Sequence, residues 1–248
     1  MPSPAASRAA TCTPAAAAMA LLTAAALAFS ATSPAPLRAQ APAFDVVIQG
    51  GRVVDGSGSP WFVADVGIKG DTIAAVAAHL PVAGARVIEA RGLVVAPGFI
   101  DVHSHSEARE DGQDMIGNPS APNNVYQGVT TVIASPDGGG SVRVGEYLAR
   151  VAAARPAINV GSFIGHGAVR DAVIGQANRP ATADELERMR GLVRTGMREG
   201  ALGLSTGLFY VPGNFAPLDE VVELGKVAGE FGGIHQSHMR DETSKVLD

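Results

Sequence analysis

Two histidines separated by one residue, His103 and His105, are the strongest candidates for chemistry in this sequence. Side chains two positions apart on a strand project to the same side, so both imidazoles can reach one ion. Imidazole is a ligand for zinc and for divalent ions of similar character. An isolated His-x-His pair is more often two surface histidines, but this pair directly follows the apolar run APGFIDV. We therefore predict that it ends a buried strand and binds a metal ion.

Other polar residues follow similar apolar segments. His238 closes the segment GIHQSH and is predicted to be a third metal ligand, whereas His235 would point to the opposite side and pack against a helix. His166, within GHGAVR, is predicted to contact the substrate or to support the site, with a purely structural hydrogen bond as the alternative. Asp101 would support the ligands or simply form a hydrogen bond within the fold.

Strands and helices must alternate regularly along the chain to bring these residues together. The strand-like segments end near five residues, His105, Ala134, His166, Ser205 and His238, at intervals of 29, 32, 39 and 33 residues. Such alternation is typical of parallel α/β folds, including the (β/α)8 barrel, whose active sites lie at the carboxyl ends of the strands. A doubly wound sheet alternates similarly, but no glycine-rich phosphate loop follows the first strand. We predict an α/β fold with a partial (β/α)8 TIM barrel.

Three segments between the strands have helical patterns. Residues 144–154 are one candidate. The clearest helix lies between Thr182 and Glu199, because Thr182 and Glu185 have the spacing of a capping box and Gly200 follows. A third begins near Pro217 and ends at Gly232. The predicted buried faces consist of Leu186, Met189, Val193 and Met197 in the second helix and Val221, Leu224, Val227 and Phe231 in the third.

Composition limits the possible classes of protein. The 248 residues are 46% hydrophobic and 17% charged, with a formal net charge of −5, which excludes a disordered chain. Lys and Arg are not clustered, so a nucleic-acid partner is not expected. The single cysteine, Cys12, precedes the predicted folded region, which therefore has neither disulfides nor thiolate ligands.

The sequence divides into three predicted parts. Residues 1–43 resemble a signal peptide and spacer, because Arg8 precedes an uncharged apolar run over 15–29, too short to span a bilayer comfortably. We expect a periplasmic or secreted protein without a stable membrane span; a signal anchor is the alternative. Residues 44–92 are predicted to form a small antiparallel β unit, and residues 93–248 the incomplete barrel.

At the level of whole segments, the sequence resembles a known family. The segments are FDVVIQGGRVVDGSG, VVAPGFIDVHSHSE, QGVTTVIASPDGGG, GHGAVR, GALGLSTGLFYVPGNFAP and SHMRDE. They are similar to those of the N-acyl-D-amino-acid deacylases, or D-aminoacylases, of the metal-dependent amidohydrolase superfamily. The resemblance implies a barrel beside a small β-sandwich, one or two zinc ions, and hydrolysis of a non-peptide C–N bond in a small N-acyl amino acid or related amide.

The resemblance also assigns roles to individual residues. It implies that His103, His105 and His238 are metal ligands. Asp137 stands where D-aminoacylases have a cysteine ligand, so we predict that it is a ligand with a possible change in metal preference; a turn residue in Pro-Asp-Gly is the alternative.

Two further residues are candidates for substrate binding. Arg240 would meet a substrate carboxylate, with a surface salt bridge as the alternative, and Tyr210 would cover the substrate or only anchor its loop. Asp241 and Glu242 are predicted to cap the next helix and to take no part in chemistry.

The length of the sequence predicts an incomplete barrel. Members of the resembled family are roughly twice as long as these 248 residues, and their general-base Asp and a further histidine ligand would lie beyond residue 248. We expect about five βα units, whereas a closed barrel needs eight. A hydrolase for another amide or cyclic imide, or a non-catalytic truncated remnant, are the alternatives.

Overall fold

The computed structural model describes residues 43–106 and 114–246. The chain divides into two compact units, Met1–Val95 and Ala96–Asp248, here called the first and second units. The predicted signal peptide lies outside the described residues. Within the described residues, no helix has the length and apolar character needed to cross a membrane.

The first unit is a five-stranded sheet that is only partly antiparallel. Its strands are β1 (Val46–Val53), β2 (Phe62–Lys69), β3 (Thr72–Ala77), β4 (Arg86–Glu89) and β5 (Val94–Val95). β1, β2 and β3 are antiparallel neighbours, whereas β4 and β5 both pair with β1 in parallel. The prediction of an antiparallel unit over 44–92 is therefore wrong for β4, because the connection over 78–85 carries the chain from β3 to the other side of β1.

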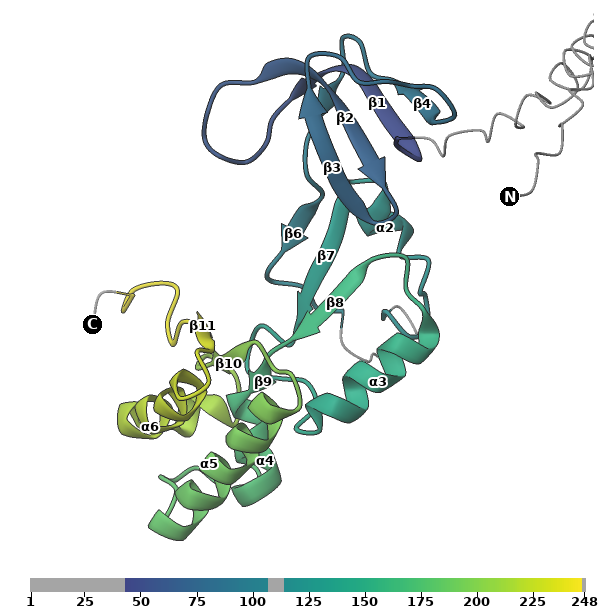
Figure 1. Cartoon of the computed structure of the whole chain (residues 1–248). Helices are drawn as coiled ribbons and strands as arrows, with labels where there is room; N and C mark the ends of the chain where they lie inside the picture. Colours follow the sequence, from purple (N-terminus) through teal and green to yellow (C-terminus); the bar gives the residue numbers. More distant parts are fainter. Residues whose placement is uncertain (1–42, 107–113, 247–248) are drawn as a thin grey trace, which may run out of the picture. The chain divides into compact units, whose positions relative to one another are not determined.

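The second unit contains six short strands, every pair of which is parallel. They form two sheets, one of β6 (Phe99–Asp101), β7 (Val129–Ala134) and β8 (Asn159–Ser162), the other of β9 (Ile164–Gly165), β10 (Gly203–Gly207) and β11 (Ile234–His238). Only Phe163 separates β8 from β9. Figure 1 labels the two strands one after the other along the chain. This part of the chain thus has an α/β fold with parallel strands, and across 43–106 and 114–246 the strands form no closed barrel.

The helices confirm most of the sequence pattern. They are α2 (Pro122–Val125), α3 (Val144–Ala154), α4 (His166–Ile174), α5 (Ala183–Arg198), the 3-10 turn η1 (Gly213–Phe215) and α6 (Leu218–Gly229). α3 has the predicted bounds, and α5 has the predicted capping box. α4 was not predicted. Phe231 is 41% exposed rather than buried, because α6 ends before it.

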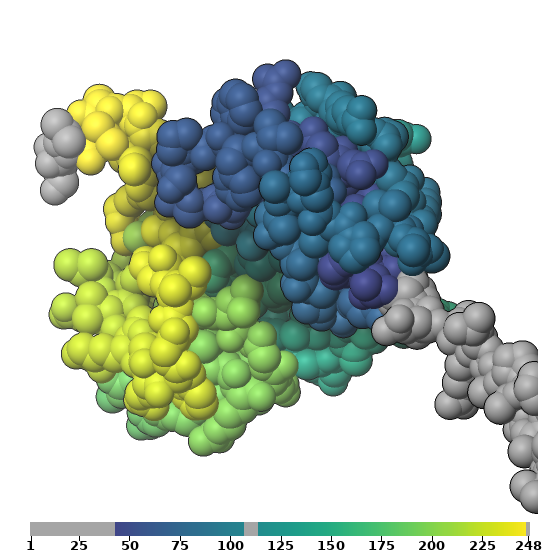
Figure 2. Space-filling view, turned by 45° about the horizontal axis from the view of Figure 1, so that its top comes forward, coloured from purple at the N-terminus to yellow at the C-terminus, as the bar shows by residue number. Residues whose placement is uncertain are grey.

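The main core of the second unit lies between these helices and the strands β9 and β10. Fully buried side chains from α4, α5, α6 and the two strands form one cluster, which includes Val169, Met189, Val193, Leu204 and Leu224. The outer surface of α5 and α6 is coloured green to yellow-green in Figure 2. This core fixes the positions of the strand ends that carry the candidate site.

The segment before His103 differs from the prediction. A buried strand was expected over 94–105, but β5 pairs with β1 in the first unit and β6 has only three residues. The two are separated by Pro97, which has no amide hydrogen to donate, and Gly98. Phe99 and Ile100 are both more than 60% exposed, and β6 pairs with β7 alone among the described strands. The boundary between the units therefore lies after Val95, three residues beyond the predicted position.

Candidate metal centre

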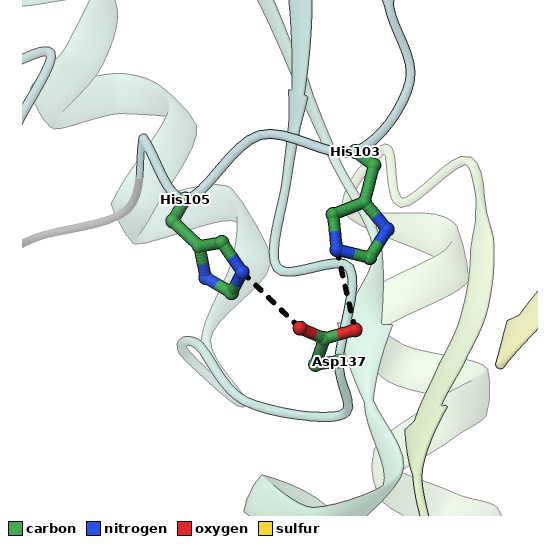
Figure 3. A group of neighbouring side chains, drawn as sticks. All are labelled: His103, His105 and Asp137. Atoms are coloured by element: carbon green, nitrogen blue, oxygen red, sulfur yellow. Dashed lines mark ion pairs between the residues drawn. The ribbon is translucent and has the colours of Figure 1, made fainter. Parts of the chain in front are cut away.

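Three polar side chains converge beyond the ends of β6 and β7 (Figure 3). The Nε2 atom of His103 lies 3.4 Å from Oδ1 of Asp137, and the Nε2 atom of His105 lies 3.1 Å from Oδ2 of the same carboxylate. One potential ligand atom from each residue lies within 4.8 Å of the others. The sequence prediction that these three residues meet is consistent with this arrangement.

Backbone hydrogen bonds orient the two histidines. The carboxylate of Asp101 accepts a hydrogen bond from the backbone amide of His103 at 3.1 Å. The amide of Ser104 donates to the carbonyl of Ile133 at 3.1 Å, which continues the pairing with β7 beyond β6. The rings of His103 and His105 lie close together at the end of this segment, with centroids 5.6 Å apart.

Tight packing fixes the turn that carries Asp137. Gly138 has a φ of +76°, and a Cβ at this position would lie 2.6 Å from the amide nitrogen of Gly207, so only glycine fits. The amide of Gly138 donates to Oγ of Ser205 at 3.1 Å, and this hydroxyl donates to the carbonyl of Ser135 at 2.6 Å. Asp137 is thus a turn residue, as one alternative held, and its side chain also faces the histidines.

The chemistry of these residues fits a divalent metal ion. Two imidazoles and one carboxylate are a donor set that binds zinc. Asp137 is only 13% exposed, and its Oδ1 atom is buried without a hydrogen bond to any described residue. A buried carboxylate oxygen without a hydrogen bond is costly, and a cation would compensate for that cost.

His238 lies next to this cluster without completing it. Its Nδ1 atom is 3.8 Å from Oδ1 of Asp137, while its Nε2 atom is 3.0 Å from Oε1 of Glu242. The rings of Tyr210 and Phe209 pack against it, with centroids 4.7 and 5.8 Å away. The role of His238 as a ligand stays a prediction, and Glu242, expected to do no chemistry, contacts a candidate ligand.

The register of β11 separates its side chains between two faces. His235 faces away from the cluster, and its Nε2 atom lies 3.1 Å from Oγ1 of Thr206. Gln236 and His238 alternate with it, and Nε2 of Gln236 lies 2.9 Å from Nδ1 of His103. Sequence reasoning missed Gln236, although its position two residues before His238 was a usable signal.

Two pockets adjoin the cluster. One, of about 480 Å³, is lined by His105, Asp137, Tyr210 and Gly213, among others. The other, of about 590 Å³, is lined by residues that include His103 and His105. These volumes are suitable for small molecules. Tyr210 therefore lines a pocket beside Asp137. Its role in covering a substrate stays a prediction.

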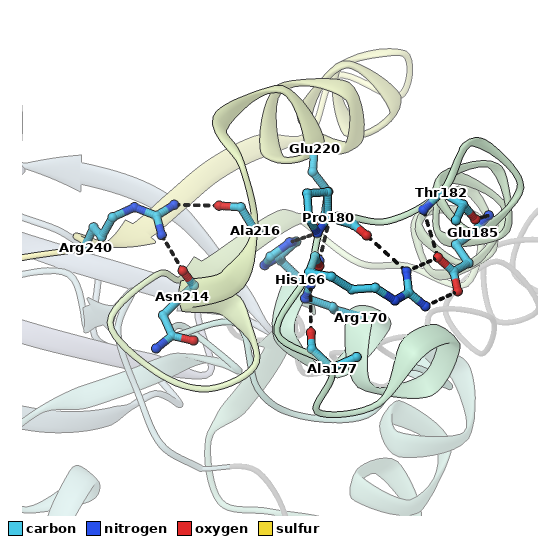
Figure 4. A network of polar contacts seen from close by, with 11 residues as sticks. His166, Arg170, Ala177, Pro180, Thr182, Glu185, Asn214, Ala216, Glu220 and Arg240 are labelled. Atoms are coloured by element: carbon cyan, nitrogen blue, oxygen red, sulfur yellow. Dashed lines mark hydrogen bonds and ion pairs between the residues drawn. The ribbon is translucent and has the colours of Figure 1, made fainter.

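His166 belongs to a different, buried cluster (Figure 4). Its side chain is fully buried, and Nε2 lies 2.9 Å from Oε1 of Glu220 on α6. Nη1 of Arg170 donates to Oε2 of the same carboxylate at 2.6 Å. This geometry favours the structural hydrogen bond that was the alternative for His166, and not contact with substrate.

Opposing effects set the ionisation of Glu220. Burial raises its pKa, but hydrogen bonds from His166 and Arg170, together with their charges, lower it more. The net result is a pKa below the usual value, so Glu220 is ionised at neutral pH. The sequence pattern predicted neither Arg170 nor Glu220 as part of a polar cluster.

Arg240 contacts the backbone of the loop that follows Tyr210. Its guanidinium donates to the carbonyl oxygens of Asn214 at 2.7 Å and Ala216 at 2.9 Å, as Figure 4 shows. It therefore holds this loop, and its contact with a substrate carboxylate stays a prediction. Its neighbour Asp241 accepts hydrogen bonds from the amides of Thr243 and Lys245, which resembles the predicted capping role.

Comparison with known proteins identifies the family. A sequence model described as "Amidohydrolase family" matches residues 86–227, more than half of the chain. The chain belongs to the amidohydrolase family. The D-aminoacylase of Alcaligenes xylosoxydans xylosoxydans is 36% identical over 227 residues, which are 82% of this chain and 46% of that protein. The chain thus spans about half the length of the curated relatives it matches.

Solved structures of this amidohydrolase branch have a similar fold. A crystal structure of D-aminoacylase matches with a TM-score of 0.73 and 36% identity, over 80% of this chain and 46% of that one. The N-acyl-D-glutamate deacylase of Bordetella bronchiseptica, in complex with zinc and a phosphonate inhibitor, matches with a TM-score of 0.72 and 32% identity over the same shares. The α/β fold of this chain therefore resembles amidohydrolase structures.

Proposed function

We propose that this chain carries the metal-binding part of a hydrolase that removes the acyl group from N-acyl-D-amino acids. The observation that carries the proposal is the convergence of His103, His105 and Asp137 at the ends of adjacent parallel strands. The similarity to D-aminoacylase and to N-acyl-D-glutamate deacylase supports the substrate class.

We also propose that the second unit is part of a (β/α)8 barrel. Its strands follow one another in chain order within each sheet, and all are parallel. β8 and β9 are nearly continuous, because only Phe163 lies between them. Five consecutive strand positions with their helices would account for this order.

His103, His105 and Asp137 would hold zinc, as one ion or as part of a two-ion centre, with His238 as the adjacent candidate. A bound zinc ion would polarise the acyl carbonyl and lower the pKa of a water molecule. The zinc in the structure of N-acyl-D-glutamate deacylase supports this choice of ion. Because Asp137 offers a carboxylate oxygen and not a thiolate, the site would also suit harder metal ions than zinc.

Residues around the cluster would bind and orient the substrate. Tyr210 lines the 480 Å³ pocket beside Asp137 and packs against His238. Arg240 holds the carbonyls of Asn214 and Ala216, so it would keep the loop that carries Tyr210 in place. Arg240 is in this proposal a positioning residue, and Tyr210 would exclude water from the pocket.

Metal analysis and an enantiomer assay test this function together. The purified chain is expected to bind zinc stoichiometrically, and Asp137→Ala is expected to lose it. The protein produced from its complete gene is expected to release acetate from N-acetyl-D-amino acids and not from the L enantiomers. Zinc binding with equal activity on both enantiomers would contradict the substrate class, and a metal-free protein would contradict the metal centre.

A second candidate is a hydrolase for another amide or a cyclic imide. Asp137 favours it, because the resemblance to D-aminoacylases implies a cysteine ligand at this position and a different ligand would change the chemistry of the metal. Hydantoins and dihydropyrimidines in the same assay would separate the two: hydrolysis of these rings without hydrolysis of N-acetyl-D-amino acids would favour the second candidate.

We further propose that the protein is exported to the periplasm or secreted. The support is the sequence of residues 1–43, in which Arg8 precedes an uncharged apolar run. The protein recovered from the periplasm or the culture medium is expected to begin near residue 44. A mature protein that keeps Met1 and stays in the cytoplasm would contradict export.

A further inference from the structure

The two ring nitrogens of His103 face different partners. Nε2 faces Asp137, with 3.4 Å between Nε2 and Oδ1, as Figure 3 shows. Nδ1 lies 2.9 Å from Nε2 of Gln236, which comes from β11, 133 residues further along the chain. Each nitrogen therefore has a neighbour that can favour or oppose a proton on it.

The side-chain amide of Gln236 defines a tautomer of His103 in this structure. An amide nitrogen can only donate, so Nδ1 must accept and the imidazole proton must lie on Nε2. Nε2, which then carries the proton, lies 3.4 Å from Oδ1 of Asp137 without forming a hydrogen bond to it. A metal ion at the cluster needs the lone pair of Nε2, which requires the proton on Nδ1 instead.

The other end of the same amide can meet this requirement. Oε1 of Gln236 is buried and has no hydrogen-bond partner among the described residues. A half-turn of the amide exchanges its oxygen and nitrogen, which places an acceptor opposite Nδ1. The amide can therefore stabilise either tautomer from one side-chain position.

We propose that Gln236 is a positioning residue that sets the tautomer of His103, with its amide donating in the metal-free protein and accepting when a metal ion is bound. This inference rests on the proposed metal centre. The register of β11 supports it, because Gln236 lies on the same face of the strand as His238, and His235 and Ser237 both lie against Thr206 on the other face. No bond is broken except the exchange of one imidazole proton between Nδ1 and Nε2 through solvent.

Zinc affinity, measured on the whole chain by competition with a chromophoric chelator, tests the proposal. Gln236→Leu removes both amide atoms and is expected to raise the zinc dissociation constant by about 10- to 100-fold, the usual effect of losing a hydrogen bond to a ligating histidine. Gln236→Glu keeps an acceptor and is expected to bind zinc at least as tightly as the unmodified chain. Ser237→Ala, on the opposite face of the strand, is the matched control and is expected to leave the dissociation constant unchanged.

Nitrogen NMR of labelled histidine reports the tautomer directly, at a pH where imidazole is neutral. We expect the His103 proton on Nε2 without metal and on Nδ1 with zinc, and a mixture of tautomers in metal-free Gln236→Leu. Thermal unfolding of each variant confirms that it folds.

The two measurements separate the inference from the proposed function. If zinc binds but Gln236→Leu matches the unmodified chain in affinity and tautomer, Gln236 has no positioning role. If the unmodified chain binds no zinc, the metal centre is wrong, and an unchanged tautomer in metal-free Gln236→Leu would then overturn the role of Gln236 as well.

Discussion

The second unit contains two polar clusters built from similar residues in opposite environments. In the candidate metal centre, two histidines whose side chains are 47% and 54% exposed face the carboxylate of Asp137. In the buried cluster, the carboxylate of Glu220 faces His166 and Arg170, whose side chains are fully buried. The arginine is the essential difference, because it supplies the permanent charge that a buried carboxylate needs.

This difference separates a structural role from a chemical one. Both carboxylate oxygens of Glu220 are hydrogen-bonded, one to His166 and the other to Arg170, whereas Oδ1 of Asp137 has no hydrogen bond within the described residues. The first carboxylate is satisfied by the chain itself. The second has only histidines near its Oδ1 atom among the described residues and forms no hydrogen bond there, and the predictions below test this contrast.

The largest effect is expected from Glu220→Ala. The substitution leaves Arg170 buried without its carboxylate, and removal of one partner from a buried pair costs about 3–5 kcal/mol. Urea unfolding gives this free energy. Glu223→Ala on the same helix is the control, because its partners Arg190 and Lys226 are at the surface and the expected loss is below about 1 kcal/mol. Equal losses in the two variants would show that burial does not distinguish the pairs.

Asp137→Ala is expected to weaken zinc binding without lowering the stability of the fold. Zinc affinity should fall by at least about 100-fold, equivalent to about 2.8 kcal/mol, while the free energy of unfolding without metal stays the same or rises. Isothermal titration and urea unfolding measure the two quantities. Asp171→Ala, which removes a carboxylate from the wall of the same pocket, is expected to leave zinc affinity unchanged. A large loss of stability in Asp137→Ala would instead make this cluster structural.

The pH dependence of stability tests the charge of Glu220. Its pKa in the folded state is below the ordinary value of 4.5, so the unfolded state takes up the proton first as the pH falls. The stabilisation from its pairing is complete above about pH 4.5 and is lost as the pH falls through the folded-state pKa. Unfolding free energies from neutral pH to about pH 3 should therefore fall less steeply for Glu220→Gln than for the unmodified chain.

A second carboxylate provides the reference for that experiment. Hydrogen bonds from Arg179 and Thr182 lower the pKa of Glu185 to about 2. Glu185 titrates in the same direction, and its side chain is 17% exposed. Glu185→Gln is therefore the reference variant: it removes a carboxylate whose folded-state pKa is also lowered, so unfolding free energies should again fall less steeply with decreasing pH than in the unmodified chain.

The smallest effect is expected from Thr182→Ala at the start of α5. The threonine hydroxyl accepts from the amide of Glu185 at 3.3 Å, and loss of such a cap costs about 1 kcal/mol. Urea unfolding measures it, and Thr182→Ser should keep most of the stability. The loss of unfolding free energy in this variant measures one exposed hydrogen bond, and the loss in Glu220→Ala is compared with it. Equal losses in the two variants would contradict the distinction between exposed and buried polar contacts.

Local patterns predicted the elements better than the partners. The bounds of α3 and the capping box of α5 follow from spacing within a single helix. His103 and His105 meet as predicted, although β6 ends at Asp101, before both of them. Phe231 was misplaced because the helical period continues in the sequence after α6 has ended. Alternation identifies a face of a strand, but it does not show where that strand stops.

Partners that are distant in sequence could not be predicted. Glu220 meets His166 across 54 positions, and Gln236 meets His103 across 133. These contacts depend on the order of strands and on their register, which no local pattern specifies. Asp137 is the exception. The resemblance to D-aminoacylases implied a metal ligand at this position, so its place beside His103 and His105 was predicted from the sequence.

The turn that carries Asp137 has a consequence for how metal preference can vary. Its backbone is held by Gly138, through Oγ of Ser205 and through the amide of Ala168, and neither contact uses the side chain at position 137. A substitution such as Asp137→Cys would therefore replace a hard oxygen donor with a soft sulfur donor on an unchanged backbone. Ligand identity and loop shape are set by neighbouring but independent positions, so evolution or a protein engineer can change the first without rebuilding the second.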